Sequence, residues 1–381
     1  MNGIEIDQDF ESGNIDDVEE LDPLHFSCKA RKDTSWRPLW FYFRLKNAAE
    51  KEITIEIANA KECLGGSHSW IKARPVFSYD QKNWDRIINT IYSEDSGIFS
   101  FKQKFQGDTV WVAFCYPYTY KDLKNYLSEI EKSPYVTVDV IGKTGEGRNL
   151  YVLTLTESSS DMADRFGVWA VARQHAGETP GSYTVKGMIN FLLSADELAS
   201  KIRKRFVYKI VPMVDIDGVC KGVYGKGSKP ADFADEDWRP NPIHPEIAAI
   251  RKAIQDYTTS SRYDVFIDFH APSGGDVNYF AIGSDAWGRL HQEQKRFMSL
   301  VEKSNPELYS SEDFVEWDED PTSTLGFSVI DQYKSHGMLV LAPETSYNQN
   351  RLGQYMTPSL MCEYGKAIAR AIWDYFWTKA L

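Results

Sequence analysis

Short apolar segments separated by polar turns fill the first third of the chain. They are rich in aromatic and β-branched residues, and they predict strands at residues 40–45, 53–60, 73–80, 98–105 and 110–118. The segment ITIEI alternates apolar and polar residues with a period of two, as a half-buried strand of an antiparallel sheet does. No long amphipathic helical pattern interrupts these segments. The pattern therefore predicts an antiparallel β-sandwich over residues 1–118.

From Tyr120 onward, apolar strands alternate with helical segments. The strands are predicted at residues 150–156, 166–173, 206–214, 263–269, 278–283 and 338–342. The helices are predicted at residues 182–193, 245–257, 287–303 and 358–381, with Pro245 and Pro358 at first helical positions and Thr357 as an N-cap. This alternation predicts an α/β domain over residues 119–381, with a mostly parallel sheet covered by helices on both faces.

The charge balance narrows the class of protein. Lys and Arg total 43 and Asp and Glu total 55, so the formal net charge is −12. Nucleic-acid and anionic-membrane surfaces need clustered positive charge, and this balance argues against both partners. With 42% hydrophobic and 26% charged residues, the composition is typical of a folded, soluble protein.

Three features bear on the cell compartment. No apolar run approaches the length of about 18 residues that a membrane-spanning helix needs. The first residues lack the basic and apolar regions of a signal peptide. The five cysteines are scattered without a CxxC pair, which favours reduced thiols. We therefore expect a cytoplasmic protein, unless a targeting segment has been removed, and the sequence sets no oligomeric state.

Reactive side chains follow four of the predicted strands. In open α/β sheets, ligands bind outside the carboxyl ends of the strands. Four such endings on one edge of a sheet indicate a functional site. The residues concerned are the run from Gln174 to Glu178, the pair Asp215 and Asp217, then His270 and Glu344.

The HxxE spacing of His175 and Glu178, with His270 at a later strand end, suits a catalytic zinc site. Zinc takes imidazole nitrogen and carboxylate oxygen, and three protein ligands leave one position for water. Zinc lowers the pKa of that water to about 7, and Glu344 lies at the right edge of the sheet to take its proton. HxxE pairs also arise by chance, and a histidine at a strand end can be an ordinary loop residue, so spacing alone leaves both interpretations open.

Several longer motifs carry a resemblance to a known family. They are FESGNIDDVEE, WFYFRLKN and YPYTYKDLKNYL in the first domain, and ARQHAGETPGS, KIVPMVDIDGV, IHPEIAAIRKAI, FIDFHAP and LAPETS in the second. Together they resemble the zinc metallocarboxypeptidase family, in its cytosolic-carboxypeptidase-like branch with an N-terminal β-sandwich. The most specific is ARQHAGET, which matches the first metal motif except at Ala176, where proline is usual.

The resemblance implies a fold, a cofactor and a set of roles. It implies that the second domain is a zinc-carboxypeptidase-like domain with a mixed, mostly parallel sheet. One Zn²⁺ per chain would be held by His175, Glu178 and His270, with Glu344 as the general base. Asp232 matches a carboxylate that orients the first histidine ligand. The substrate would be a peptide or an acyl-amino acid.

The chain departs from the family pattern where a substrate carboxylate is bound. Ala234 and Asp235 replace an Asn and an Arg, and Gly225 stands where a further Arg is expected, with Lys226 next to it. A hydrogen bond to a charged group contributes about 1.5–3 kcal/mol, so these losses would severely weaken binding of a carboxylate. Arg239 is the local substitute, and Lys226 and Asp235 are the other predicted substrate-binding residues.

The acidic tract Asp232, Asp235, Glu236 and Asp237 suits a cationic or neutral substrate group, or is simply a solvated acidic loop. Residues 310–326 are expected to form a long loop near Glu344 that shapes specificity.

Three functions follow from these observations. The leading one is a zinc-dependent hydrolase of amide bonds, a peptidase or an amidohydrolase acting on a modified substrate. The second is a non-catalytic binding protein of the same fold. The third places the function in the β-sandwich, whose aromatic residues would bind a partner, although packing inside the protein explains these residues better.

Overall fold

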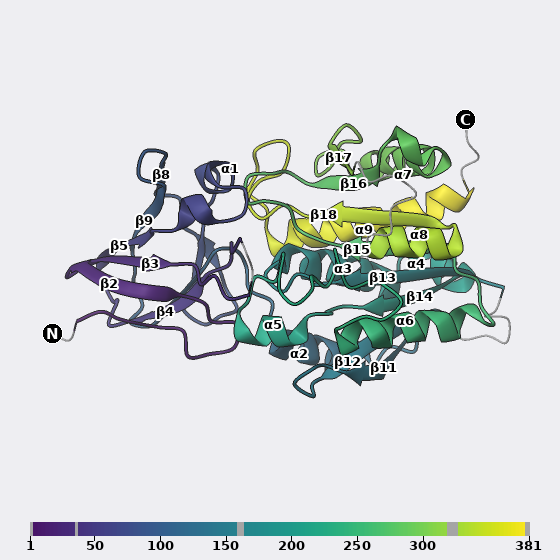
Figure 1. Ribbon diagram of the computed structural model, residues 1–381, viewed down its shortest axis with the longest axis horizontal. Coiled ribbons are helices and arrows are strands. Elements are labelled where there is room, and N and C mark those ends of the chain that lie inside the picture. The colour runs from purple at the N-terminus through teal and green to yellow at the C-terminus, as the bar shows by residue number, and fades with distance from the viewer. Residues whose placement is uncertain (1–2, 35–36, 158–163, 318–326, 378–381) are drawn as a thin grey trace.

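Two units lie side by side along the long axis of the molecule (Figure 1). The computed structural model describes residues 3–34, 37–157, 164–317 and 327–377. The strands of the smaller unit all come before residue 114, and the larger unit is built from the rest of the chain. Within the described residues, no helix has the length and apolar character needed to cross a bilayer.

The smaller unit is a sandwich of two five-stranded sheets. All neighbouring strands are antiparallel except β3 and β5, which are parallel. The first sheet has the order β1 (Glu5–Asp7), β4 (Tyr42–Lys46), β10 (Val110–Ala113), β6 (Val76–Ser78) and β7 (Asp85–Arg86). The second has the order β2 (Asp16–Asp22), β3 (His25–Lys29), β5 (Glu52–Ile57), β9 (Ile98–Lys104) and β8 (Thr90–Ser93). The predicted antiparallel sandwich is therefore confirmed, with one parallel pair added.

Alternation along β5 shows how the sandwich core forms. Ile53, Ile55 and Ile57 are fully buried, whereas Thr54 and Glu56 are only partly covered. Burying each isoleucine side chain contributes about 1.5–3 kcal/mol. The aromatic segment at residues 40–43 is also buried, so it packs inside the sandwich and does not form a binding surface. Two short helices, η1 (Ala60–Glu62) and α1 (Ser67–Ile71), connect the strands.

The larger unit is built on an eight-stranded mixed sheet. Its four central strands are parallel, in the order β14 (Phe206–Val211), β13 (Phe166–Ala172), β15 (Val265–Phe269) and β18 (Leu339–Glu344). Antiparallel strands β12 (Asn149–Leu155) and β11 (Val136–Lys143) extend one side. On the other side β16 (Tyr279–Gly283) runs antiparallel to β18, and β17 (Phe314–Trp317) runs parallel to β16. The mixed, mostly parallel sheet is confirmed.

Two sequence predictions about this sheet need correction. The third predicted strand was expected to reach residue 214, but β14 ends at Val211, because Pro212 has no N–H to give to a ladder hydrogen bond. Residues 310–326 were expected to form one loop, yet residues 314–317 form the edge strand β17. The rest of that segment, residues 318–326, lies outside the described residues.

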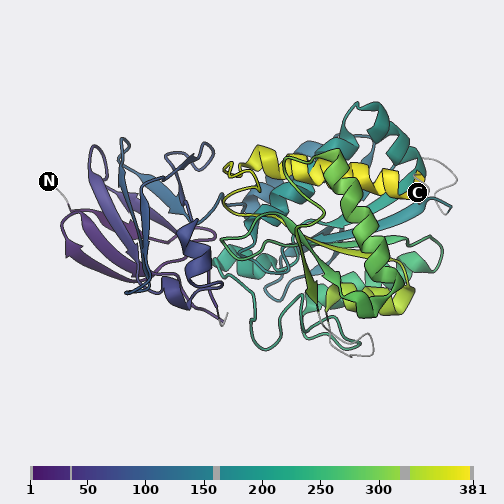
Figure 2. The same cartoon turned by 90° about the horizontal axis from the view of Figure 1, so that it is seen from above.

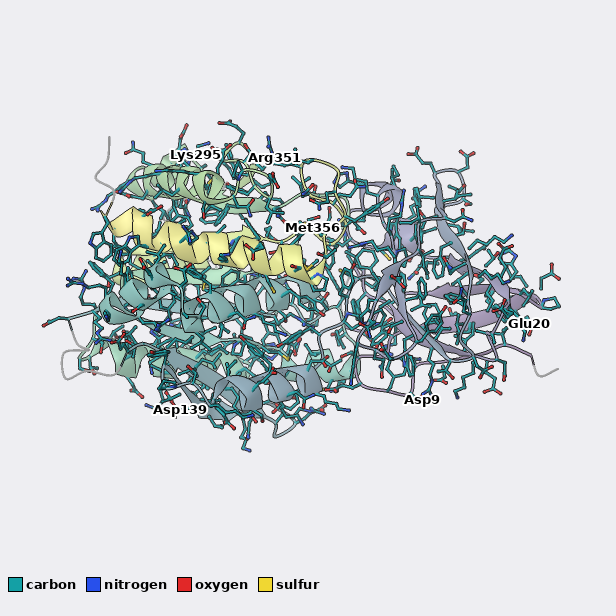
Figure 3. The ribbon with its side chains drawn as sticks, turned by 180° about the vertical axis from the view of Figure 1, so that it is seen from behind. Asp9, Glu20, Asp139, Lys295, Arg351 and Met356 are labelled. Atoms are coloured by element: carbon teal, nitrogen blue, oxygen red, sulfur yellow. The ribbon has the colours of Figure 1, made fainter. Side chains whose placement is uncertain are left out.

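Helices cover both faces of the sheet. Figure 1 shows α6 (Pro245–Thr258) and α8 (Ser328–His336) on the near face. Figure 3, from behind, shows α3 (Thr179–Leu193) and α9 (Pro358–Trp377) crossing the far face together. The remaining helices of the described chain are α2 (Tyr120–Ile130), α4 (Glu197–Arg205), α5 (Ile216–Lys221), η2 (Asp285–Trp287) and α7 (Arg289–Ser304).

Loops of the sandwich contact the loops that follow β15 and β18. Figure 2 shows the two units meeting at this end of the larger one. The guanidinium of Arg86 in β7 donates hydrogen bonds to the carbonyls of Tyr347 (2.9 Å) and Met356 (2.6 Å). The ring of His68 in α1 lies 2.7 Å from the carboxylate of Asp276. The sandwich therefore supports the segments that leave the two strands ending at the candidate site.

Candidate metal centre and active site

The turn after β13 brings an HxxE segment to the carboxyl edge of the sheet. Arg173, which follows the strand, has a positive φ of 62° and turns the chain sharply. Its buried guanidinium donates to the carbonyls of Ala176 (2.9 Å) and Tyr118 (3.0 Å) and to the hydroxyl of Ser182 (3.0 Å). These bonds fix the turn between β13 and α3. Arg173 could not be selected from the sequence, because its partners lie on three different segments.

His175, Glu178 and His270 converge in this buried turn. The Nδ1 atoms of the two histidines each lie 2.9 Å from Glu178, one from each carboxylate oxygen. The exposed fractions are 1% for His175, 1% for Glu178 and 7% for His270. One ligand atom from each residue lies within 4.8 Å of the others. Two imidazole nitrogens and a carboxylate at this spacing fit the donor set of a catalytic zinc site.

The far side of each imidazole is held by a carboxylate. The Nε2 of His175 lies 3.0 Å from Asp232, and the Nε2 of His270 lies 3.0 Å from Asp268. Burial alone would lower the pKa of His175, but the charges of Asp232 and Glu178 outweigh it and raise the pKa to about 10. In metal sites, such outer carboxylates fix the tautomer and orientation of the ring.

Asp268 was missed in the sequence, although a signal was present. Asp268 and His270 are two residues apart at the end of β15, so their side chains lie on the same face of the strand. One oxygen of Asp268 also accepts hydrogen bonds from the amide of Gln174 and the hydroxyl of Ser328. The pattern DFH at a strand end could have identified it.

Glu344 lies at the end of β18, next to His270. The backbone N–H of His270 donates to the carbonyl of Pro343 at 3.0 Å, which sets the two strand ends side by side. The Glu344 side chain is 7% exposed, and its Oε2 has no hydrogen-bond partner among the described residues. Burial raises the pKa of Glu344 to about 7, against the lowering effect of His270 and Lys226. A carboxyl group with this pKa can both accept and release a proton near neutral pH.

A cavity of about 170 Å³ opens beside these residues. Its polar lining residues are His175, Lys226, Asp235, Asp268, His270, Ser328 and Glu344. Its apolar lining residues are Ala234, Ala281, Trp317, Phe327, Val329, Ile330 and Ala342. The two predicted histidine ligands and the predicted general base therefore line one cavity with two of the three predicted substrate-binding residues, Lys226 and Asp235. Glu178 lies behind the two histidines and does not line the cavity.

Arg239 does not join this group. It is exposed, its Nε donates to the carbonyl of Glu236 at 2.6 Å, and it does not line the cavity. Lys226 lies 3.6 Å from Glu178 through its Nζ. Burial would lower the pKa of Lys226, but the charges of Glu178, Glu344 and Asp235 outweigh it and raise the pKa well above its usual value.

Gly225 lies where the loop backbone closely approaches the metal-binding turn. Its φ is +93°, and a Cβ placed on it would lie 2.8 Å from the backbone nitrogen of Ala176 and 3.4 Å from the Cα of His175. Because the loop backbone runs against the metal-binding turn, an arginine side chain has no room at this position. Ala234 is buried and lines the cavity, so the wall carries a methyl group at this position.

The fold is that of a metallocarboxypeptidase. The structure matches a solved metallo-carboxypeptidase from Burkholderia cenocepacia with a TM-score of 0.87 at 24% sequence identity, covering 100% of both chains. It also matches one from Pseudomonas aeruginosa, solved in complex with (2-guanidinoethylmercapto)succinic acid, with a TM-score of 0.80 at 21% identity. That match covers 97% of this chain and 98% of the other. At these identities the likeness shows the fold alone.

Sequence comparison supplies the family. Residues 6–115 match the cytosolic carboxypeptidase N-terminal domain, and residues 123–241 match the zinc carboxypeptidase family. Cytosolic carboxypeptidase 6 of Caenorhabditis elegans is 32% identical over 302 residues, which cover 72% of this chain and 65% of that protein. Cytosolic carboxypeptidase 2 of Danio rerio is 28% identical over 333 residues, which cover 79% and 46%.

The chain therefore belongs to the zinc carboxypeptidase family of metallopeptidases, in the branch that carries the cytosolic carboxypeptidase N-terminal domain. The resemblance found in the sequence motifs is confirmed. The chain spans less than two thirds of the length of these two relatives.

Proposed function

We propose that this protein is a zinc-dependent hydrolase of amide bonds. The observation that carries the proposal is the meeting of two histidine Nδ1 atoms on Glu178, in one cavity with a buried carboxyl group whose pKa is about 7. His175, Glu178 and His270 would hold one zinc ion per chain. Glu344 would be the general base.

The chain's own residues supply the remaining chemistry. When bound, zinc lowers the pKa of water and polarises a carbonyl group. The unpartnered Oε2 of Glu344 accepts the proton of the attacking water and later gives it to the leaving nitrogen, since its pKa suits both transfers. Asp232 and Asp268 hold the imidazoles in place. Lys226 supplies positive charge for the developing charge on the carbonyl oxygen.

We propose that the substrate is a peptide or an acyl-amino acid, with no nucleic-acid or membrane partner, and that the domains divide at residues 118 and 119. The names of the relatives, cytosolic carboxypeptidases, support a cytoplasmic location.

A second candidate substrate class is favoured by the altered carboxylate site. Among the described residues that line the cavity, Lys226 is the single basic side chain. The positions expected to hold arginine or asparagine are occupied by Gly225, Ala234 and Asp235. A substrate whose terminal carboxyl group is blocked, for example as an amide, needs no paired arginine. An amidohydrolase acting on such a modified substrate is therefore the alternative to a peptidase that releases free C-terminal residues.

Metal content and turnover test the proposal together. Elemental mass spectrometry should find one zinc per wild-type chain, and less in a His175→Ala variant. The matched control is His25→Ala, because His25 lies in the sandwich and bonds Glu56 there. Mass spectrometry should then follow a mixture of free-acid and amidated peptides. A wild-type protein that lacks zinc after supplementation would contradict the proposal, and one that holds zinc without turnover would support a non-catalytic binding protein.

A further inference from the structure

Acidic side chains outnumber basic ones in the wall of the cavity beside the metal centre. Among the described residues, three carboxyl groups line it, namely Asp235, Asp268 and Glu344. The lining contains one lysine, Lys226, whose Nζ lies 3.6 Å from Glu178. A substrate group that enters the cavity therefore meets more carboxylate oxygens than cationic groups from the described residues.

One oxygen of Asp268 lacks a partner. Its other oxygen receives the donors from His270, Gln174 and Ser328. Oδ1 is buried, and no described residue donates a hydrogen bond to it. The Asp268 residue is 1% exposed and lines the cavity. A buried acceptor without a donor is unfavourable, and an N–H group on a ligand in the cavity would satisfy it.

Asp235 adds a second acceptor to the cavity wall. Its backbone N–H is bound to Asp232 at 3.0 Å, but no hydrogen bond or ion pair reaches its carboxylate from the described residues. A cationic group on a ligand would therefore give this carboxylate a direct hydrogen-bond partner, which the described residues do not supply.

The remaining wall is apolar and leaves space. Ala234, Ala281 and Ala342 present only methyl groups, and Trp317 and Phe327 add aromatic surface. Such a wall suits the methylene stem of a long side chain whose charged end reaches the carboxylates. A glutamate or aspartate side chain would instead bring its charge against Asp235 and Asp268.

From this arrangement we propose that the cavity binds a substrate side chain with a protonated amino or guanidino group, as in lysine or arginine, and that Asp235 determines this preference. The inference rests on the proposed function, because it assigns the substrate class of the same site.

Four acyl-dipeptides that differ in the last residue, lysine, arginine, leucine or glutamate, test the inference. The kcat/KM of the zinc-loaded enzyme should be highest for lysine or arginine and lowest for glutamate. In Asp235→Asn, the preference for lysine over leucine should fall by about tenfold, as expected for loss of a charge-assisted contact. The matched control is Glu236→Gln. Glu236 is the next residue after Asp235, and its side chain does not line the cavity, so this variant removes a neighbouring charge only.

Binding separates this inference from the proposed function. Calorimetry with zinc-loaded Glu344→Gln measures the dissociation constants of the same four peptides without turnover. The same order of binding supports the inference even if the wild type hydrolyses none of them. A preference for glutamate, an unchanged preference in Asp235→Asn, or no binding of any peptide would overturn it. Turnover that favours glutamate would leave the hydrolase intact and remove the inference alone.

Discussion

Replacing Asp232 by asparagine tests the metal centre most directly. Oδ1 of Asp232 faces the Nε2 of His175 at 3.0 Å and the N–H groups of Ala234 (2.9 Å) and Asp235 (3.0 Å). Oδ2 accepts the N–H of Gly227. An asparagine has only one acceptor oxygen, so either Gly227 or the other three donors would face an NH₂ group.

The size of the effect follows from these contacts. Loss of a carboxylate behind a metal-binding histidine weakens metal affinity by about 10–100-fold, which corresponds to about 1.4–2.7 kcal/mol. The unsatisfied N–H adds about 1–3 kcal/mol of strain on the loop. We therefore expect Asp232→Asn to bind zinc about 100-fold more weakly than wild type.

Asp268→Asn provides a graded comparison. The Oδ1 of Asp268 has no described partner, so the amide nitrogen can occupy that position without facing another donor. Oδ2 would remain an acceptor for His270. Only the charge is lost, and we expect the smaller reduction in zinc affinity, about tenfold.

Competition with a chelator of known zinc affinity measures these differences, with bound metal read by elemental mass spectrometry. Asp237→Asn is the matched control, because the buried Asp237 carboxylate binds the N–H groups of Ile243 and His244 instead of a metal-binding imidazole. Its zinc affinity should match wild type. Wild-type zinc affinity in Asp232→Asn, or an equal loss of affinity in Asp237→Asn, would refute the role assigned to Asp232.

Three further outcomes are expected. Glu344→Gln should keep its zinc and lose about 10²–10⁴-fold in kcat, the usual contribution of a general base, and full activity would rule Glu344 out. Arg86→Met should lower the free energy of unfolding, measured in urea, by about 2–3 kcal/mol, because the carbonyls of Tyr347 and Met356 lose their donor. Unchanged stability would show that the sandwich does not support this loop. Burial raises the pKa of Asp215 to about 7, so the protonated form is favoured on folding and this carboxyl group destabilises the fold progressively as pH rises from about 4 to 7. The free energy of unfolding of Asp215→Asn should therefore rise relative to that of wild type by up to about 4 kcal/mol between pH 4 and pH 7. If urea unfolding shows a difference that does not vary with pH, the raised pKa of Asp215 is contradicted.

Two of the strands that were not predicted, β2 and β17, share a physical cause. Strand β2 has the sequence DDVEELD, and every residue in it is exposed, so no buried face leaves a period in the pattern. The edge strand β17 is also largely uncovered. These strands form because a neighbouring strand offers hydrogen bonds, and that neighbour is not visible in the local sequence. The long, half-buried elements, such as β5 and α9, were predictable from their own residues.

The residues of the candidate site also differ in how far the sequence could identify them. His175, Glu178, His270 and Glu344 could be selected because each follows a strand of a parallel sheet, where the carboxyl ends meet. Arg239 was selected by closeness in sequence alone, and the chain turns it toward solvent. Closeness along a loop does not fix the direction of a side chain.

The sequence by itself determined the two fold classes and the chemistry at the strand ends, because the hydrophobic period of a segment follows from which of its faces is buried and the residue types at a strand end can be read directly. Only the tertiary structure decided that Asp268 stands behind His270, that Gly225 leaves no room for a side chain, and that Asp235 and Asp268 share one cavity with Lys226. These features depend on loops from separate strands that meet in space. Gln174 and Asp268, for example, are hydrogen-bonded although they lie 94 positions apart, and no local pattern records such a distance.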